Sequence, residues 1–205
     1  MYNTSMRDFN LSTVLRSPKV INAFEKVDRK DFVRPEYVDC AYDDTPLPIE
    51  YGQTISQPST VAFMLELLEL EEGLKVLDVG SGSGWTTALL AHIVGKNGEV
   101  IGVELIPELV SFGRKNIAKY CNGSNASIFP AGKIVGYPSK APYDRMLVSA
   151  GADEVPSELI KQLKVGGILV IPVKNSLYKL VKNSSGIGGV QKEEYPGFVF
   201  VPLKE

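Results

Sequence analysis

The chain has 205 residues, of which 44% are hydrophobic and 22% charged, and its formal net charge is −2. This length favours a single domain with a sizeable core, and a mildly acidic chain lacks the basic surface typical of nucleic-acid-binding domains, so we expect no nucleic-acid partner. The sequence shows no basic-then-apolar leader and no apolar run of the about 20 residues that a bilayer-spanning helix needs, so we expect no membrane association.

Thiol and imidazole side chains are too few for a familiar metal centre. Cys40 and Cys121 lie far apart, and His92 is the only histidine. These three residues match no zinc pattern, so we predict no metal site. Two scattered cysteines without a secretory signal are typical of a reducing compartment, so we expect a cytoplasmic protein. His92 lies in an apolar helical stretch, which favours a structural or surface role.

The N-terminal third is predicted to be helical and loop-rich. Ser17 and Pro18 are a typical helix start, and apolar residues follow at helical spacing up to Val27. Residues 31–56 contain several prolines and acids and predict an irregular segment. Their apolar side chains indicate that it is ordered, and long loops in compact domains are usually functional. A further helix begins at Pro58 and ends at residues 71–73.

From residue 73 onward, strand-like apolar runs alternate with helical patterns. Such alternation predicts parallel βαβ units, and the last two runs predict an antiparallel pair. We therefore expect an α/β fold with a mixed, mostly parallel sheet of about seven strands and helices on both faces. The expected strands are 76–79, 100–104, 126–129, 146–150, 167–173, 177–182 and 198–201, and the expected helices are 85–94, 107 to about 120, and 156–163.

A glycine-rich turn follows the first of these strands. Gly80, Gly82 and Gly84 alternate there, and Glu104 ends the next strand. Glycines permit a sharp turn and let a ligand lie against bare main chain, and an acid at the end of the second strand accepts hydrogen bonds from ribose hydroxyls. The spacing differs from the Gly-x-Gly-x-x-Gly of dinucleotide sites, and the turn lacks the lysine of a phosphate-binding loop. A nucleoside with a compact zwitterionic tail fits better, so we predict S-adenosylmethionine as the cofactor.

Ser56 lies just before the helix that begins at Pro58. Its hydroxyl and the free amides of the first helical turn favour an anion there, such as a carboxylate substrate. Ser56 is also a good candidate for the N-cap of that helix. The two roles are compatible, and the local pattern leaves both open.

With these motifs the chain resembles the protein-L-isoaspartate O-methyltransferase family from about residue 16 onward. The glycine turn alone indicates only a class I methyltransferase. The Pro-Leu-Pro-Ile of residues 46–49 and the Gln-Thr-Ile-Ser-Gln-Pro of residues 53–58 are specific to the isoaspartyl enzymes. The other matching segments are 27–33, 41–49, 76–84, 103–108, 136–138, 162–167 and 201–203.

The resemblance implies a Rossmann-like class I methyltransferase: one domain, with a substrate segment at 1–72 and a cofactor-binding core at 73–205. It implies methyl transfer from S-adenosylmethionine to the free carboxylate of L-isoaspartyl residues in damaged proteins; the ester collapses to a succinimide, and repeated cycles restore aspartate. We expect a monomer. Ser56 corresponds to the family's active-site serine, and we assign it the orientation of the carboxylate. The implied cofactor-binding residues are Asp78, Gly80, Ser81, Gly82, Ser83, Glu104, Leu105, Gly132 and Lys133. The implied substrate-binding residues are Pro46, Leu47, Gln53, Thr54, Ile55 and Gln57.

One residue of the family pattern is absent. The family carries an aspartate for the adenine amino group shortly before its Gly-Tyr-Pro, whereas this chain has no acid there, whether Ala131 or Gly132 takes that place. Losing one such hydrogen bond costs on the order of 1 kcal/mol. The missing aspartate therefore keeps open a non-catalytic cofactor-binding module. A class I methyltransferase for RNA or a small molecule is a further alternative.

Overall fold

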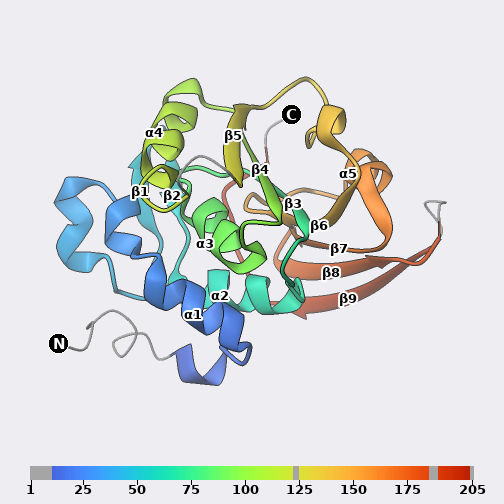
Figure 1. The fold of residues 1–205 in the computed structure, drawn as a ribbon, viewed down its shortest axis with the longest axis horizontal. Coiled ribbons are helices and arrows are strands. Elements are labelled where there is room, and N and C mark those ends of the chain that lie inside the picture. The colour runs from blue at the N-terminus through green and yellow to red at the C-terminus, as the bar shows by residue number, and fades with distance from the viewer. Residues whose placement is uncertain (1–10, 122–124, 185–188, 204–205) are drawn as a thin grey trace.

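The computed structural model describes residues 11–121, 125–184 and 189–203, which form a seven-stranded sheet with helices on both faces and a separate two-stranded hairpin (Figure 1). The strand order of the sheet is β5-β4-β3-β6-β7-β8-β9. The strands are β1 (Leu47–Glu50), β2 (Gln53–Ile55), β3 (Lys75–Val79), β4 (Glu99–Glu104), β5 (Ala126–Pro130), β6 (Tyr143–Val148), β7 (Leu163–Val173), β8 (Ser176–Lys182) and β9 (Val190–Pro196). The α-helices are α1 (Pro18–Lys26), α2 (Pro58–Leu67), α3 (Trp85–Val94), α4 (Pro107–Ile117) and α5 (Ser157–Gln162), and the short 3-10 helices are η1 (Leu11–Thr13), η2 (Arg29–Phe32), η3 (Pro35–Cys40) and η4 (Pro138–Lys140).

Strands β3 to β7 pair in parallel, whereas β8 and β9 add antiparallel strands at one edge. The two faces of the sheet build two apolar cores. Along β3, Val76 packs into one core while Leu77 and Val79 pack into the other, because successive strand residues point to opposite faces. Helices α1 to α4 contribute to the first core and α5 to the second. The mixed, mostly parallel sheet that we predicted is confirmed.

Residues 31–56, which we predicted to be irregular, contain short regular elements. Strands β1 and β2 form an antiparallel hairpin in which Leu47 faces Ile55 and Pro48 faces Thr54. Leu47 and Ile55 are buried against the first core. Pro48, within β1, is tolerated because each strand of an isolated hairpin has one unpaired edge, whereas Pro35 begins η3 and Pro46 precedes β1.

The predicted last strand was wrong. The strand that pairs with β8 is β9, whereas residues 198–201 lie outside any strand. Strand β9 reads Val-Gln-Lys-Glu-Glu-Tyr-Pro and is mostly exposed. An edge strand needs no apolar alternation, and charges on it prevent pairing with other chains.

Other boundaries differ by a few residues. Strand β6 covers Tyr143–Val148 instead of 146–150, and α4 ends at Ile117 instead of about 120. Helix α5 ends at Gln162 because Leu163 already pairs with Tyr143, so β7 starts earlier than predicted. Within residues 11–121, 125–184 and 189–203, no helix has the length and apolar character to cross a membrane.

Candidate active site

The carboxyl ends of β3, β4 and β6 meet at one edge of the sheet. The N–H groups of Gly80 and Ser81 donate to the carbonyl of Val103 at 2.9 and 3.1 Å, and the N–H of Ser149 donates to the carbonyl of Val79 at 2.8 Å. These bonds fix the glycine turn between β4 and β6. Ligands of open α/β sheets bind outside the carboxyl ends of the strands, which is where the turn lies.

The glycine turn has the backbone that its sequence predicts, with φ values of 79° at Gly80, 50° at Gly82 and 86° at Gly84. Gly84 has a second reason to lack a side chain. A Cβ there would lie 2.9 Å from the carbonyl oxygen of Gly113. Helix α4 therefore packs directly on the turn, so part of the glycine pattern serves helix packing as well as access for a ligand.

Glu104 ends β4 and is 7% exposed. Its Oε2 accepts the N–H of Gly82 at 2.9 Å, and its Oε1 accepts the N–H of Ile106 at 3.0 Å. These bonds fix the carboxylate in the cavity wall. Each carboxylate oxygen has lone pairs left for a further donor, so Glu104 can accept hydroxyl groups of a bound ligand.

A cavity of about 180 Å³ covers these strand ends. The predicted cofactor-binding residues in its wall are Gly80, Gly82, Glu104, Leu105, Gly132 and Lys133. Apolar wall is added by Ile106, Ile134 and, from the segment after β9, Val201, Pro202 and Leu203.

A smaller cavity of about 30 Å³ adjoins the first. The two share Thr54, Gly80, Gly82 and Ser149. The smaller one is rich in hydroxyl groups, and its other lining residues include Ser56, Ser81, Ser83, Trp85 and Thr86. Two buried polar atoms of this lining, Ser81 Oγ and Trp85 Nε1, have no hydrogen-bond partner among the described residues. Buried polar groups are normally paired, so these atoms are available to a bound polar group or to water.

Ser56 is not the cap of helix α2, so that alternative is wrong. The N-cap position is Gln57. In the first turn, the N–H of Ser59 donates to Oδ1 of Asp44 at 2.8 Å, so a carboxylate of the chain itself already meets this helix terminus. The hydroxyl of Ser56 makes no hydrogen bond to any described residue and lines the smaller cavity.

The other predicted substrate residues divide into two groups. Gln53 and Thr54 line the large cavity, and Thr54 and Ile55 line the smaller one. Pro46, Leu47 and Gln57 line neither cavity. Leu47 is a buried core residue, and Gln57 Nε2 donates to Ser59 Oγ at 3.1 Å.

Asp78 lies beneath the glycine turn and is fully buried. Burial raises its pKa to about 6, although hydrogen bonds from Thr87 and Thr86 lower it, and the nearby charge of Glu104 raises it. The hydroxyl groups of Thr87 and Thr86 lie 2.6 and 2.8 Å from its Oδ2. Asp78 therefore supports the start of helix α3 from below and is not part of either cavity wall.

The cavity wall near Ala131 has no acid in place of the missing aspartate. Ala131, Gly132, Lys133 and Ile134 form this wall, and Glu104 is the one acidic residue among the described residues that line the two cavities. The N–H of Ala131 donates to the carbonyl of Glu104 at 2.8 Å, which fixes the start of this segment.

Two parts of the wall were not among the predicted site residues. Ser149 follows β6 and belongs to both cavities. Residues 201–203 pair with Gly151, whose N–H donates to the carbonyl of Val201 at 2.8 Å. Residues 201–203 matched the family pattern, but only their position in space brings them to the site.

The whole described chain matches one family of enzymes. The model of the protein-L-isoaspartate(D-aspartate) O-methyltransferase (PCMT) family matches residues 3–205. The chain belongs to this family. The protein-L-isoaspartate O-methyltransferase of Thermococcus onnurineus is 49% identical over 195 residues, which cover 93% of this chain and 87% of the relative. Protein-L-isoaspartate O-methyltransferase 2 of Archaeoglobus fulgidus is 46% identical over 189 residues, which cover 92% of this chain and 86% of the relative.

Solved structures agree with this family membership. A PCMT structure from Plasmodium falciparum, solved in complex with S-adenosyl-L-homocysteine, has a TM-score of 0.82 at 30% identity. The match covers 94% of this chain and 93% of that one. The resemblance and the Rossmann-like class I methyltransferase fold predicted from the sequence are thereby confirmed.

Proposed function

We propose that the chain transfers the sulfonium methyl group of S-adenosylmethionine to the free carboxylate of L-isoaspartyl residues in damaged proteins, which begins their repair. Beyond family membership, one observation carries this proposal: the cavity that contains Glu104 and the cavity that contains Ser56 share Thr54 and Ser149 as lining residues. A ligand held at the glycine turn and an acceptor held at Ser56 therefore lie side by side.

The large cavity suits the cofactor. Gly80 and Gly82 offer bare main chain, and Glu104 can accept hydrogen bonds from the ribose hydroxyls. Its charge also disfavours a 2′-phosphate. We assign Leu105, Gly132 and Lys133 to the adenine end of the cavity. When bound, S-adenosylmethionine supplies an electrophilic methyl group.

The acceptor needs orientation more than activation. A carboxyl group with a pKa of about 3.5 is already ionised at neutral pH, so no general base is required. His92 is exposed and contacts Asn22 Oδ1 at 2.7 Å, in keeping with a surface role. Ser56 donates a hydrogen bond to one carboxylate oxygen and leaves the other free to attack. Orientation of this kind supplies about 7–11 kcal/mol at best.

We further infer that two parts of the chain bind different molecules. Residues 1–72 hold the acceptor protein, since Gln53 to Ser56 belong to them, and residues 73–205 hold the cofactor. The protein works as a cytoplasmic monomer and does not methylate nucleic acids; its net charge of −2 supports the last point.

One assay tests the proposal against its alternatives. The protein is incubated with methyl-labelled S-adenosylmethionine and two peptides that differ only in aspartate or isoaspartate. Base-labile label on the isoaspartyl peptide alone supports the proposal. Label on RNA indicates another acceptor, and cofactor binding without transfer indicates a non-catalytic module.

The role of Ser56 has its own test. Ser56→Ala should lower kcat by about 10- to 100-fold, because a misplaced reacting group costs that much, while the Kd of the cofactor stays unchanged. An equal loss of turnover and cofactor affinity would mean that Ser56 serves the fold.

A further inference from the structure

Arg29 is a buried cation that ties the Ser56 segment to the loop before β1. It lies in η2 and is 2% exposed. Its two terminal nitrogens, Nη1 and Nη2, donate to five main-chain carbonyls from two separate segments, whereas Nε has no partner among the described residues. They lie 2.8 Å from the oxygen of Ala41, 3.3 Å from Asp43, 2.9 Å from Thr45, 3.5 Å from Ile55 and 3.0 Å from Ser56.

The guanidinium contacts two residues that line the smaller cavity, Trp85 and Ser56. Its carbon is 5.4 Å from the centre of the Trp85 ring. Arg29 itself does not line either cavity. Burial lowers its pKa to about 10, although the charges of Asp44 and Asp43 raise it. A cation held this far from water needs its carbonyl partners, so the two segments and the guanidinium stabilise one another.

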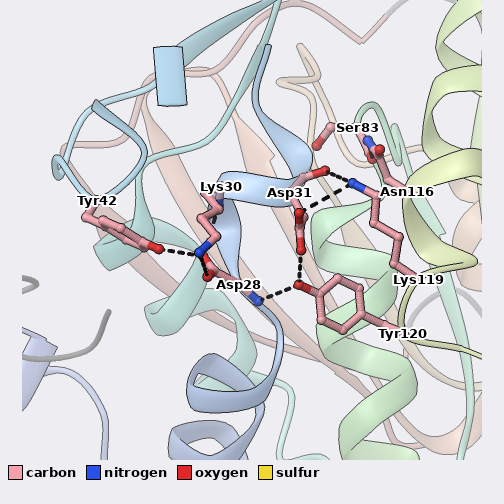
Figure 2. Close-up of polar contacts among 8 residues, drawn as sticks. All are labelled: Asp28, Lys30, Asp31, Tyr42, Ser83, Asn116, Lys119 and Tyr120. Atoms are coloured by element: carbon pink, nitrogen blue, oxygen red, sulfur yellow. Dashed lines mark hydrogen bonds and ion pairs between the residues drawn. The ribbon is translucent and has the colours of Figure 1, made fainter. Parts of the chain in front are cut away.

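The element that carries Arg29 is fixed to the turn that directly follows helix α4, as Figure 2 shows. The hydroxyl of Tyr120 donates to Asp31 Oδ2 at 2.5 Å and accepts the N–H of Asp28 at 3.1 Å. Lys119 Nζ donates to the carbonyl of Asp31 at 2.9 Å. One turn earlier, Asn116 Nδ2 donates to the carbonyl of Ser83 at 3.0 Å (Figure 2). The same helix end therefore holds both η2 and the glycine turn.

We propose that Arg29 is a positioning residue for methyl transfer: by holding the main-chain carbonyls of Ile55 and Ser56, it sets where the Ser56 hydroxyl holds the acceptor carboxylate. This inference rests on the proposed function of Ser56. A displacement of about 1 Å in a reacting group can lower the rate about 100-fold. Lysine is a compact point charge without the planar fork of arginine, so it cannot hold both segments at once.

The experiment compares Arg29→Lys and Arg29→Met with a matched control, Lys182→Met. Lys182 is also a buried cation held by main-chain carbonyls, those of Ile160 and Leu163 at 2.7 Å each, and it lines neither cavity. For each variant, kcat and KM are measured with an isoaspartyl peptide, Kd with S-adenosylhomocysteine, and Tm by thermal unfolding.

Both Arg29 variants should lower kcat by at least about tenfold, with Lys less harmful than Met, while the Kd of S-adenosylhomocysteine changes by less than about threefold. Lys182→Met should lower Tm without lowering kcat of the folded protein. A second readout is a double-mutant cycle: in a Ser56→Ala background, Arg29→Lys should cost little further turnover, because the residue through which it acts is gone.

The inference is overturned if the Arg29 variants keep kcat as Lys182→Met does, or if Arg29→Lys costs as much in the Ser56→Ala background as in the wild type. If neither Arg29 variant folds, Tyr120→Phe is used as the test variant, because it loosens η2 without removing the buried charge. Unchanged turnover of Tyr120→Phe then overturns the inference. A wild-type protein that does not methylate the isoaspartyl peptide refutes the proposed function itself, whereas an active wild type with insensitive Arg29 variants refutes only this inference.

Discussion

Replacing Glu104 by glutamine tests the hydrogen-bond geometry of the cofactor cavity. Both carboxylate oxygens already accept main-chain N–H groups, from Gly82 at 2.9 Å and Ile106 at 3.0 Å. An amide presents one oxygen and one NH₂ group, so one of these two N–H donors faces another donor. A buried donor left without a partner costs about 1–3 kcal/mol, and we expect Glu104→Gln to lower the free energy of unfolding by that amount.

The effect on cofactor binding follows from the same geometry. Hydrogen bonds to a charged group are worth about 1.5–3 kcal/mol, which corresponds to a factor of about 10 to 150 in Kd. Glu104→Gln should therefore weaken S-adenosylhomocysteine binding by about 10- to 150-fold through the lost bond to a ribose hydroxyl.

Isothermal titration calorimetry measures this change, with thermal unfolding to verify that the variant is folded. Glu108→Gln is the control, because Glu108 is an exposed acid in the first turn of α4 and lines neither cavity. Affinity of Glu104→Gln equal to that of Glu108→Gln would refute the assignment of Glu104 to the ribose.

Three further predictions concern the cavity wall and the strand ends. Ala131→Asp should tighten S-adenosylhomocysteine binding by about two- to tenfold in calorimetry, because one added hydrogen bond is worth about 0.5–1.5 kcal/mol. Gly84→Ala should lower the free energy of unfolding in urea more than Gly73→Ala does. Both positions have positive φ, 86° and 81°, but only at Gly84 would a Cβ meet an atom, at 2.9 Å from the carbonyl oxygen of Gly113, which adds about 1–3 kcal/mol. Asp78→Asn should remove a pH dependence of stability. The folded-state pKa of Asp78, about 6, exceeds the ordinary 3.8, so the wild type loses about 3 kcal/mol of stability as pH rises from about 4 through 6. Urea unfolding of wild type and variant across this pH range measures the difference.

Each of these predictions has a contrary result. Unchanged cofactor affinity in Ala131→Asp would place this residue away from adenine. Equal destabilisation at Gly84 and Gly73 would mean that α4 yields to a methyl group without cost. A constant stability difference between wild type and Asp78→Asn across pH 4–7 would mean that this carboxyl group titrates normally.

The cofactor side of the molecule could be predicted from sequence because its signals are local. The apolar run at residues 75–79, the alternate glycines and Glu104 each define their own backbone or their own position at a strand end. Parallel pairing of β3 with β4 then brings Glu104 to Gly82 without any further information.

The acceptor side could not be predicted in the same way because its structure depends on distant contacts. The turn of the β1–β2 hairpin uses Glu50 and Tyr51 at φ values of 97° and 52°, which residues other than glycine rarely adopt. The resemblance pointed to Ser56, but no local pattern indicated that Asp44 meets the start of α2 or that Arg29 holds Ser56.

The residues that close the large cavity lie in the segment after β9 and not in the sheet itself. Val201, Pro202 and Leu203 line the cavity, and they are held by bonds to Gly151, an isolated bridge and the packing of Leu203 on the second core, not by the sheet ladder. A peptide bond cut just after Pro196 would leave all seven strands paired while opening one wall. Bound cofactor should therefore slow proteolysis of this segment. The rate of that single cleavage would then report the fraction of protein molecules that have cofactor bound.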